Sequence, residues 1–203
     1  MIWVAWRRQR LQVLVISGVV LLYGGAALAE RLQPGLTGMT RQLAGYFVGL
    51  VAMFWGVPLL ARELESGVYR MSWTQGLTRG RWLAYMLGVA AAGTVVLTGV
   101  LAAILAWAVS GEAPGRPRDA LDLLQSDSVG PALFARVLFG LCLGAMLGAL
   151  IRRAQLAVPL AMLGTGLAQL GLRQVGPALE LLLCLLGAAG CIALTWLAIR
   201  RRS

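Results

Sequence analysis

Six apolar stretches of 18 to 28 residues, separated by short polar segments, constrain this chain more than any other feature of its sequence. A helix that crosses the hydrocarbon core of a bilayer needs about 20 apolar residues. We therefore predict an all-α integral membrane protein with six transmembrane helices in a single domain, residues 1–203. The spans are expected at residues 11–29, 43–60, 82–109, 132–151, 154–172 and 178–199.

The composition agrees with a membrane protein and disagrees with a nucleic-acid binder. Apolar residues make up 59% of the chain and charged residues 13%, which is more apolar surface than a soluble domain of 203 residues can bury. The net charge is +10, and every basic residue is an arginine. These arginines stand in short groups between the apolar stretches, whereas a nucleic-acid binder gathers them on one soluble face.

The arginines also predict the orientation in the membrane. With the N-terminus inside, the inner segments hold twelve arginines and two acidic residues, Glu63 and Glu65. The outer segments hold six arginines and six acidic residues. Cytoplasmic loops carry the excess of positive charge in membrane proteins. Both termini are therefore expected in the cytoplasm.

Two missing residue types exclude several kinds of site. The chain contains no lysine, so it cannot contain a lysine-bearing phosphate-binding loop for ATP. It contains no histidine, which excludes a Ser-His triad and imidazole metal ligands. Its three cysteines lie inside apolar stretches without metal-ligand spacing. We predict no catalytic residue, metal site or cofactor in this chain, and energy for any transport must come from another subunit or an ion gradient.

The longest polar interruption on the inner side, residues 61–83, predicts a short amphipathic helix between the second and third spans. Apolar residues recur there at the spacing of one helical face, at Leu64, Val68 and Met71. Arg62 and Glu65 are three residues apart and can pair on the opposite side. By pattern alone, the segment could equally be a solvated loop with a helix that rests on the membrane surface.

This segment resembles the loop between the second and third spans of ABC-type export permeases. The likeness is greatest to an actinobacterial branch with the pattern ARELE-G-x-x-R-x-x-W-T-Q-x-x-T-R-x-R-W-L, and a weaker one extends to the G subfamily. Residues 130–153 resemble the fourth span of the same branch. In that family the loop forms a coupling helix on the ATPase subunit. The resemblance thus implies an ATPase-docking role for Arg62, Glu63, Glu65, Gly67, Arg70, Trp73 and Gln75.

The resemblance implies a permease subunit in a bacterial cell membrane that pairs with a second permease copy, identical or related, and with cytoplasmic ABC ATPase subunits. ATP and Mg would be bound by those subunits, and the exported substrate would be a small molecule, lipid or peptide. One alternative is a self-immunity exporter for a peptide antibiotic. Another is a membrane scaffold or sensor that docks a partner without transport. The link at residues 173–177 is shorter than in the relatives, which puts in doubt any outer gate built there.

Two further groups of residues stand out inside the spans. Gly140, Gly144 and Gly148 repeat every fourth residue and are expected on one helix face, where another helix can approach closely. Arg136 and Glu180 lie about one turn inside the outer ends of their spans, where a charge is costly unless it is paired or near water. With Gln169, they are candidates for a translocation path. The alternatives are interfacial snorkelling for the two charges and a bond between helices for Gln169.

Overall fold

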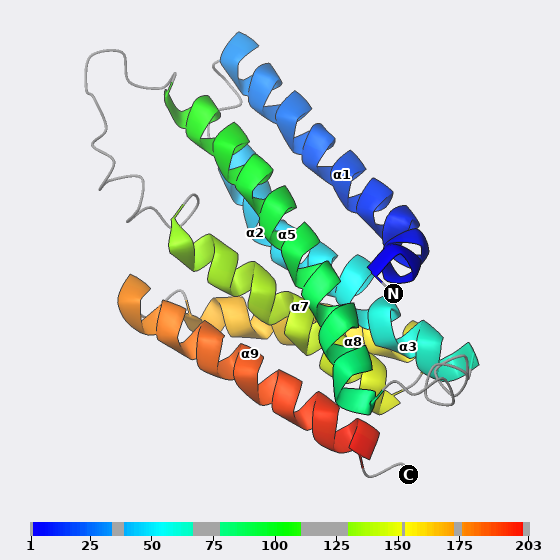
Figure 1. Ribbon diagram of the computed structural model, residues 1–203. Coiled ribbons are helices and arrows are strands. Elements are labelled where there is room, and N and C mark those ends of the chain that lie inside the picture. Colours follow the sequence, from blue (N-terminus) through cyan, green and yellow to red (C-terminus); the bar gives the residue numbers. More distant parts are fainter. Residues whose placement is uncertain are drawn as a thin grey trace.

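The computed structural model describes residues 2–33, 39–66, 78–110, 130–151, 153–172 and 176–200 (Figure 1). Apart from single residues at helix ends, all of these residues are helical, which confirms the predicted all-α fold for this part of the chain. The elements are α1 (Ile2–Leu32), α2 (Met39–Val51), the π-helical turn η2 (Ala52–Gly56), α3 (Val57–Ser66), α5 (Arg79–Ser110), α7 (Pro131–Ile151), α8 (Ala154–Leu172) and α9 (Pro177–Arg200).

Several of these helices are long and apolar enough to cross a membrane. Within the described residues, five stretches qualify: Gly45–Glu65, Gly80–Trp107, Pro131–Ile151, Ala154–Leu172 and Ala178–Arg200. In α1, where the first span is expected, the described apolar stretch is Leu14–Glu30. The chain is therefore multi-pass, as predicted.

The second span is one continuous helical path that changes its winding in the middle. The path runs from Met39 to Ser66 through α2, η2 and α3. In η2 the N–H of Val57 donates to the carbonyl of Ala52, five residues earlier, so this turn is one residue wider than an α-helical turn. Pro58 follows directly, and a proline ring clashes with the carbonyl four residues before it in a regular helix. A wide turn at this point relieves that clash.

The third span begins earlier than its apolar pattern indicates. The sequence places it from Trp82, but α5 begins at Arg79. Thr78 is the capping residue, since its Oγ1 accepts a bond from the N–H of Arg81 at 3.4 Å and its carbonyl accepts one from Trp82 at 3.0 Å. A polar cap therefore adds almost one helical turn before the first apolar side chain.

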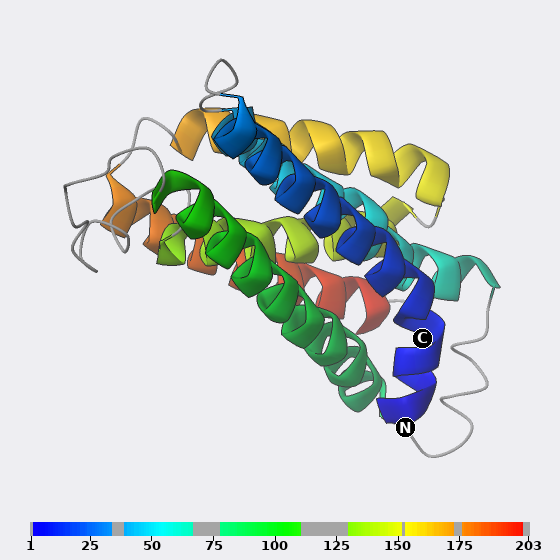
Figure 2. The same ribbon diagram turned by 90° about the horizontal axis from the view of Figure 1, so that it is seen from above.

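α7 lies at the centre of the bundle and packs against the second span, α8, α9 and α5 (Figure 1). Eleven of its residues are buried, including Leu141, which is 1% exposed. α1 lies along α5 in both views and also contacts α2 (Figure 2). By contrast, α8 buries a single narrow stripe at Ala157, Ala161 and Thr165. Its exposed leucines suit a surface that faces lipid.

The helix ends that carry the described inner-segment arginines gather at one end of the bundle (Figures 1 and 2). The start of α1, the end of α3, the starts of α5 and α8 and the end of α9 all lie there. Exposed arginines in or next to these ends are Arg10, Arg62, Arg81, Arg153 and Arg200. We call this the arginine-rich end; the positive-inside rule would place it in the cytoplasm.

Candidate functional site

The second span continues without a break into the first of the residues expected to dock a partner. Arg62, Glu63 and Glu65 lie on the last turns of α3, and the helix that carries them begins within the candidate span Gly45–Glu65. Arg62 and Glu65 are exposed and Glu63 is half-buried. The other four predicted docking residues, Gly67, Arg70, Trp73 and Gln75, lie outside the described residues. Whether the segment after Ser66 forms an amphipathic helix stays a prediction.

Glu65 does not pair with Arg62 as expected; it bonds to another span. Its carboxylate Oε1 accepts a hydrogen bond from the backbone N–H of Ala154, the first residue of α8, at 2.9 Å. The first N–H groups of a helix have no partner within the helix and lie at the positive end of its dipole. A carboxylate accepts a hydrogen bond from such an N–H and is attracted to the positive end of the dipole. An ion pair with Arg62 on an exposed surface would contribute little to stability. Glu65 therefore joins the end of the second span to the start of the fifth.

A weak signal for this contact exists in the sequence. The residue before α8 is Arg153, whose side chain has no acceptor and cannot cap a helix. The backbone carbonyl of Arg153 accepts hydrogen bonds from the N–H groups of Leu156 and Ala157, so Arg153 is in the capping position. The helix therefore starts without a capping side chain of its own. The N–H groups of such a start are left to bond to water or to an acceptor from elsewhere in the chain. Spacing along the sequence could not identify Glu65 as that acceptor, because 89 positions separate it from Ala154.

The three glycines of α7 face the second span of the same chain. A Cβ on Gly144 would lie 2.5 Å from the carbonyl oxygen of Ala52 and 3.0 Å from the Cα of Gly56. One on Gly148 would lie 2.5 Å from the carbonyl oxygen of Val57, and one on Gly140 would lie 2.9 Å from the Val48 side chain. We call this contact the glycine seam. The backbones of α7 and the second span are in contact along this seam, and only glycine fits at its centre.

Two consecutive residues of the wide turn η2, Trp55 and Gly56, contact two different helices. Gly56 faces α7, where a Cβ on it would lie 2.7 Å from the carbonyl oxygen of Leu141. Trp55 is fully buried, and its ring fills the space above Gly93 of α5, where a Cβ would lie 2.5 Å from the indole. The second span is therefore held on both sides at the level of its π-helical turn.

Arg136 and Glu180 form an ion pair between α7 and α9. Arg136 Nη2 donates to Glu180 Oε2 at 2.7 Å, and its Nε donates to Oε1 of the same carboxylate. Glu180 is 2% exposed and Arg136 is 17% exposed. The two-pronged geometry matches a guanidinium to a carboxylate, and Glu180 also lies in the first turn of α9, where the helix dipole favours a negative charge. The two charges thus pair with each other and do not snorkel separately.

The third candidate for a translocation path does not join this pair. Gln169 is half-buried on α8, and within the described residues it makes no hydrogen bond to Arg136 or Glu180. The part of the chain that the structure describes also has no group of three potential metal-ligating side chains, and its cysteines are free and buried. The described contacts are therefore mechanical: a continuous helix, a cap, a glycine seam and a buried ion pair.

Comparison with known families adds one finding. A family model described as ABC-2 membrane transporter related matches residues 26–175. The match includes the glycine seam, Glu65, Arg136 and Gln169, and ends before α9. No curated protein and no solved structure matches the chain.

Proposed function

Because the chain belongs to the ABC-2 membrane transporter related family, it is a membrane subunit of an ABC transporter, and we propose that it couples ATP hydrolysis on a separate subunit to export. The family match over most of the chain is the observation that carries this proposal. The substrate class we propose is a small molecule, lipid or peptide. ATP and Mg would be bound by cytoplasmic ABC ATPase subunits, and a second permease copy would complete the path.

The contacts of the second span support mechanical coupling. A push on the segment after Ser66 would act on a helix that runs unbroken to Met39. Glu65 ties that helix to α8, and the glycine seam ties it to α7. Closely packed helices move together because their interfaces have few intermediate arrangements. We therefore propose that the docked ATPase moves the second, fourth and fifth spans as one unit. Assignment to the actinobacterial branch rests only on the resemblance of residues 61–83 and 130–153.

Reversing the charge at Arg62 tests the docking surface. Arg62 is exposed on α3, whereas Glu65 has a bond within the chain, so a substitution at Arg62 leaves the bond between Glu65 and α8 in place. We expect Arg62→Glu to insert normally but to retain about tenfold less ATPase, since a like-charge contact at an interface costs several kcal/mol. Co-purification with the ATPase, and substrate-stimulated ATP hydrolysis in proteoliposomes, measure the effect.

Arg10→Glu is the matched control for this experiment. Arg10 is an exposed arginine near the same end of the bundle, but it lies on α1. If Arg62→Glu retains as much ATPase as Arg10→Glu and wild type, α3 does not dock the ATPase. If the ATPase binds but no compound stimulates it, the protein is a docking scaffold and the export proposal is wrong.

Labelling from the two sides of the membrane tests the orientation. The natural cysteines are buried in the spans and can be replaced by alanine to give a clean background. In that background we expect Ser203→Cys to react with an impermeant maleimide only after access from the cytoplasm, and Ser126→Cys only from outside. Both positions lie outside the described residues, and their sides follow from the arginine distribution. Labelling of both from the same side would contradict the six-span arrangement.

A further inference from the structure

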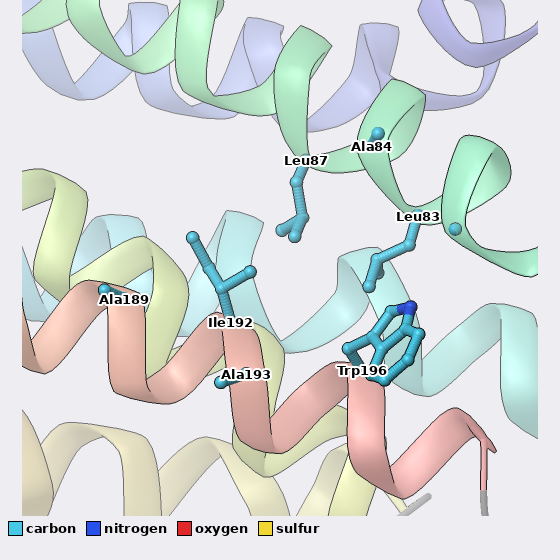
Figure 3. Close-up of a pocket in the computed structure, with 8 residues that line it drawn as sticks. Leu83, Ala84, Leu87, Ala189, Ile192, Ala193 and Trp196 are labelled. Atoms are coloured by element: carbon cyan, nitrogen blue, oxygen red, sulfur yellow. The ribbon is translucent and has the colours of Figure 1, made fainter.

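An apolar groove lies between α5 and α9 at the arginine-rich end of the bundle (Figure 3). Its volume is about 510 Å³, within the range of about 300 to 1,000 Å³ that is typical of ligand pockets. Small residues line both helices here, Gly80 and Ala84 on α5 and Ala189 and Ala193 on α9, and leave space between them. The side chains that line the groove offer no charged group with which to hold a cofactor. The groove suits an apolar occupant.

Larger apolar side chains form the walls of the groove. Leu87 and Ile192 extend into the space between the helices, and Leu83 lies over the indole of Trp196 (Figure 3). On each helix the lining residues recur at the spacing of one face, so the groove runs along the helix axes. Ile192 and Trp196 are 41% exposed, which leaves the groove open at the side of the bundle. An extended hydrocarbon chain fits such a shape.

The end of the groove changes from apolar to basic. Trp196 lies there, and its indole Nε1 is 3.7 Å from where a Cβ on Gly80 would be. Arg200 is one turn further along the same face of α9, with its guanidinium carbon 5.1 Å from the centre of the Trp196 ring. Arg81 is exposed on the first turn of α5, next to Gly80. A tryptophan followed by arginines is typical of the level at which lipid headgroups begin.

We propose that this groove binds an anionic phospholipid, with one acyl chain between α5 and α9 and the phosphate at Arg200 and Arg81. Charge complementarity supports this occupant, because basic pockets between spans on the cytoplasmic side attract anionic headgroups. A free phosphate ion would leave the apolar walls in contact with water. The proposal concerns a lipid ligand and does not depend on the ATPase. Lipid binding can therefore fail while the export proposal stands, and the export proposal can fail while lipid binding stands.

The lining and the charge can be tested separately. We expect Ala193→Phe to fill the groove and to weaken phosphatidylglycerol binding about tenfold, since several methylene contacts are lost. We expect Arg200→Gln to weaken phosphatidylglycerol binding about fivefold, as one arginine near a headgroup contributes on that scale. Phosphatidylcholine binding should weaken less, because its choline cancels the net charge of its phosphate. Binding to the purified permease in detergent is measured by native mass spectrometry with lipids of identical acyl chains.

Two variants serve as matched controls. Leu194→Phe adds an aromatic ring to an exposed position of α9 that does not line the groove. Arg153→Gln removes an exposed arginine at the same end, next to α8, whose packing partners are α7 and the second span. Both should bind phosphatidylglycerol within twofold of wild type.

Three outcomes would overturn the proposal. The first is equal phosphatidylglycerol binding by Ala193→Phe and Leu194→Phe. The second is an equal loss with Arg153→Gln and Arg200→Gln, which would mean that only the overall charge matters. The third is loss of self-association in Ala193→Phe with lipid binding intact, which would show that a second copy of the chain covers the groove.

Discussion

Replacing Gly144 by leucine is expected to destabilise the permease strongly. Even a methyl group there would meet the carbonyl oxygen of Ala52 at 2.5 Å and the Cα of Gly56 at 3.0 Å. Both neighbours are backbone, so no side-chain rotation can make room, and the second span must move away from α7. We expect a loss of about 3 kcal/mol, the upper end of the cost of overpacking. The midpoint of thermal unfolding in detergent measures it.

Gly166 provides the matched control for Gly144. It lies on α8, and a Cβ there would have no atom within 4 Å. Gly166→Leu should melt at or slightly above the wild-type temperature, because leucine has a higher helix propensity than glycine. If Gly144→Leu melts together with Gly166→Leu, the two helices do not cross as closely as described.

Removing one partner of the Arg136–Glu180 pair is expected to have the second large effect. Arg136→Leu leaves the carboxylate of Glu180, which is 2% exposed, without the guanidinium that binds it. An uncompensated buried charge costs about 3 to 5 kcal/mol. The double variant Arg136→Leu/Glu180→Leu should recover most of that loss, because apolar pairs often replace buried ion pairs without destabilisation. The same thermal unfolding assay on the four proteins of this cycle gives the coupling energy.

The double variant also separates stability from transport. If it folds as well as wild type but no longer exports substrate, the pair contributes to the translocation path in addition to joining α7 and α9. If it folds and exports normally, the pair is only structural. Single variants that are each as stable as wild type would contradict a buried, mutually dependent pair.

Much of the fold could be predicted from the sequence, because long apolar stretches have few ways to satisfy their backbone groups in lipid. Five of the six predicted helices of spanning length and the ABC permease family are confirmed. Helix ends were less predictable, because they depend on polar caps and not on apolar length. Thr78 extends the third span by a cap, and α3 continues to Ser66 although the apolar run ends at Leu60.

The candidate site was predicted less completely than the fold. The sequence identified Arg136 and Glu180 as unusual but could not pair them, since their contact depends on how α7 and α9 pack. It paired Glu65 with Arg62, because helical periodicity reports only neighbours along the same helix. The bond to Ala154 depends on two spans meeting in space. The docking roles of Gly67, Arg70, Trp73 and Gln75 remain predictions from the resemblance alone.

The π-helical turn in the second span determines the direction in which every later side chain of that span points. Successive residues of an α-helix are rotated by about 100°, so one additional residue in a turn changes the direction of every later side chain. Without the extra residue in η2, Glu65 would be rotated away from the start of α8 and Arg62 would face another way. The direction of the charged side chains at the end of α3 is therefore set about two turns earlier, where Gly56 crosses Gly144.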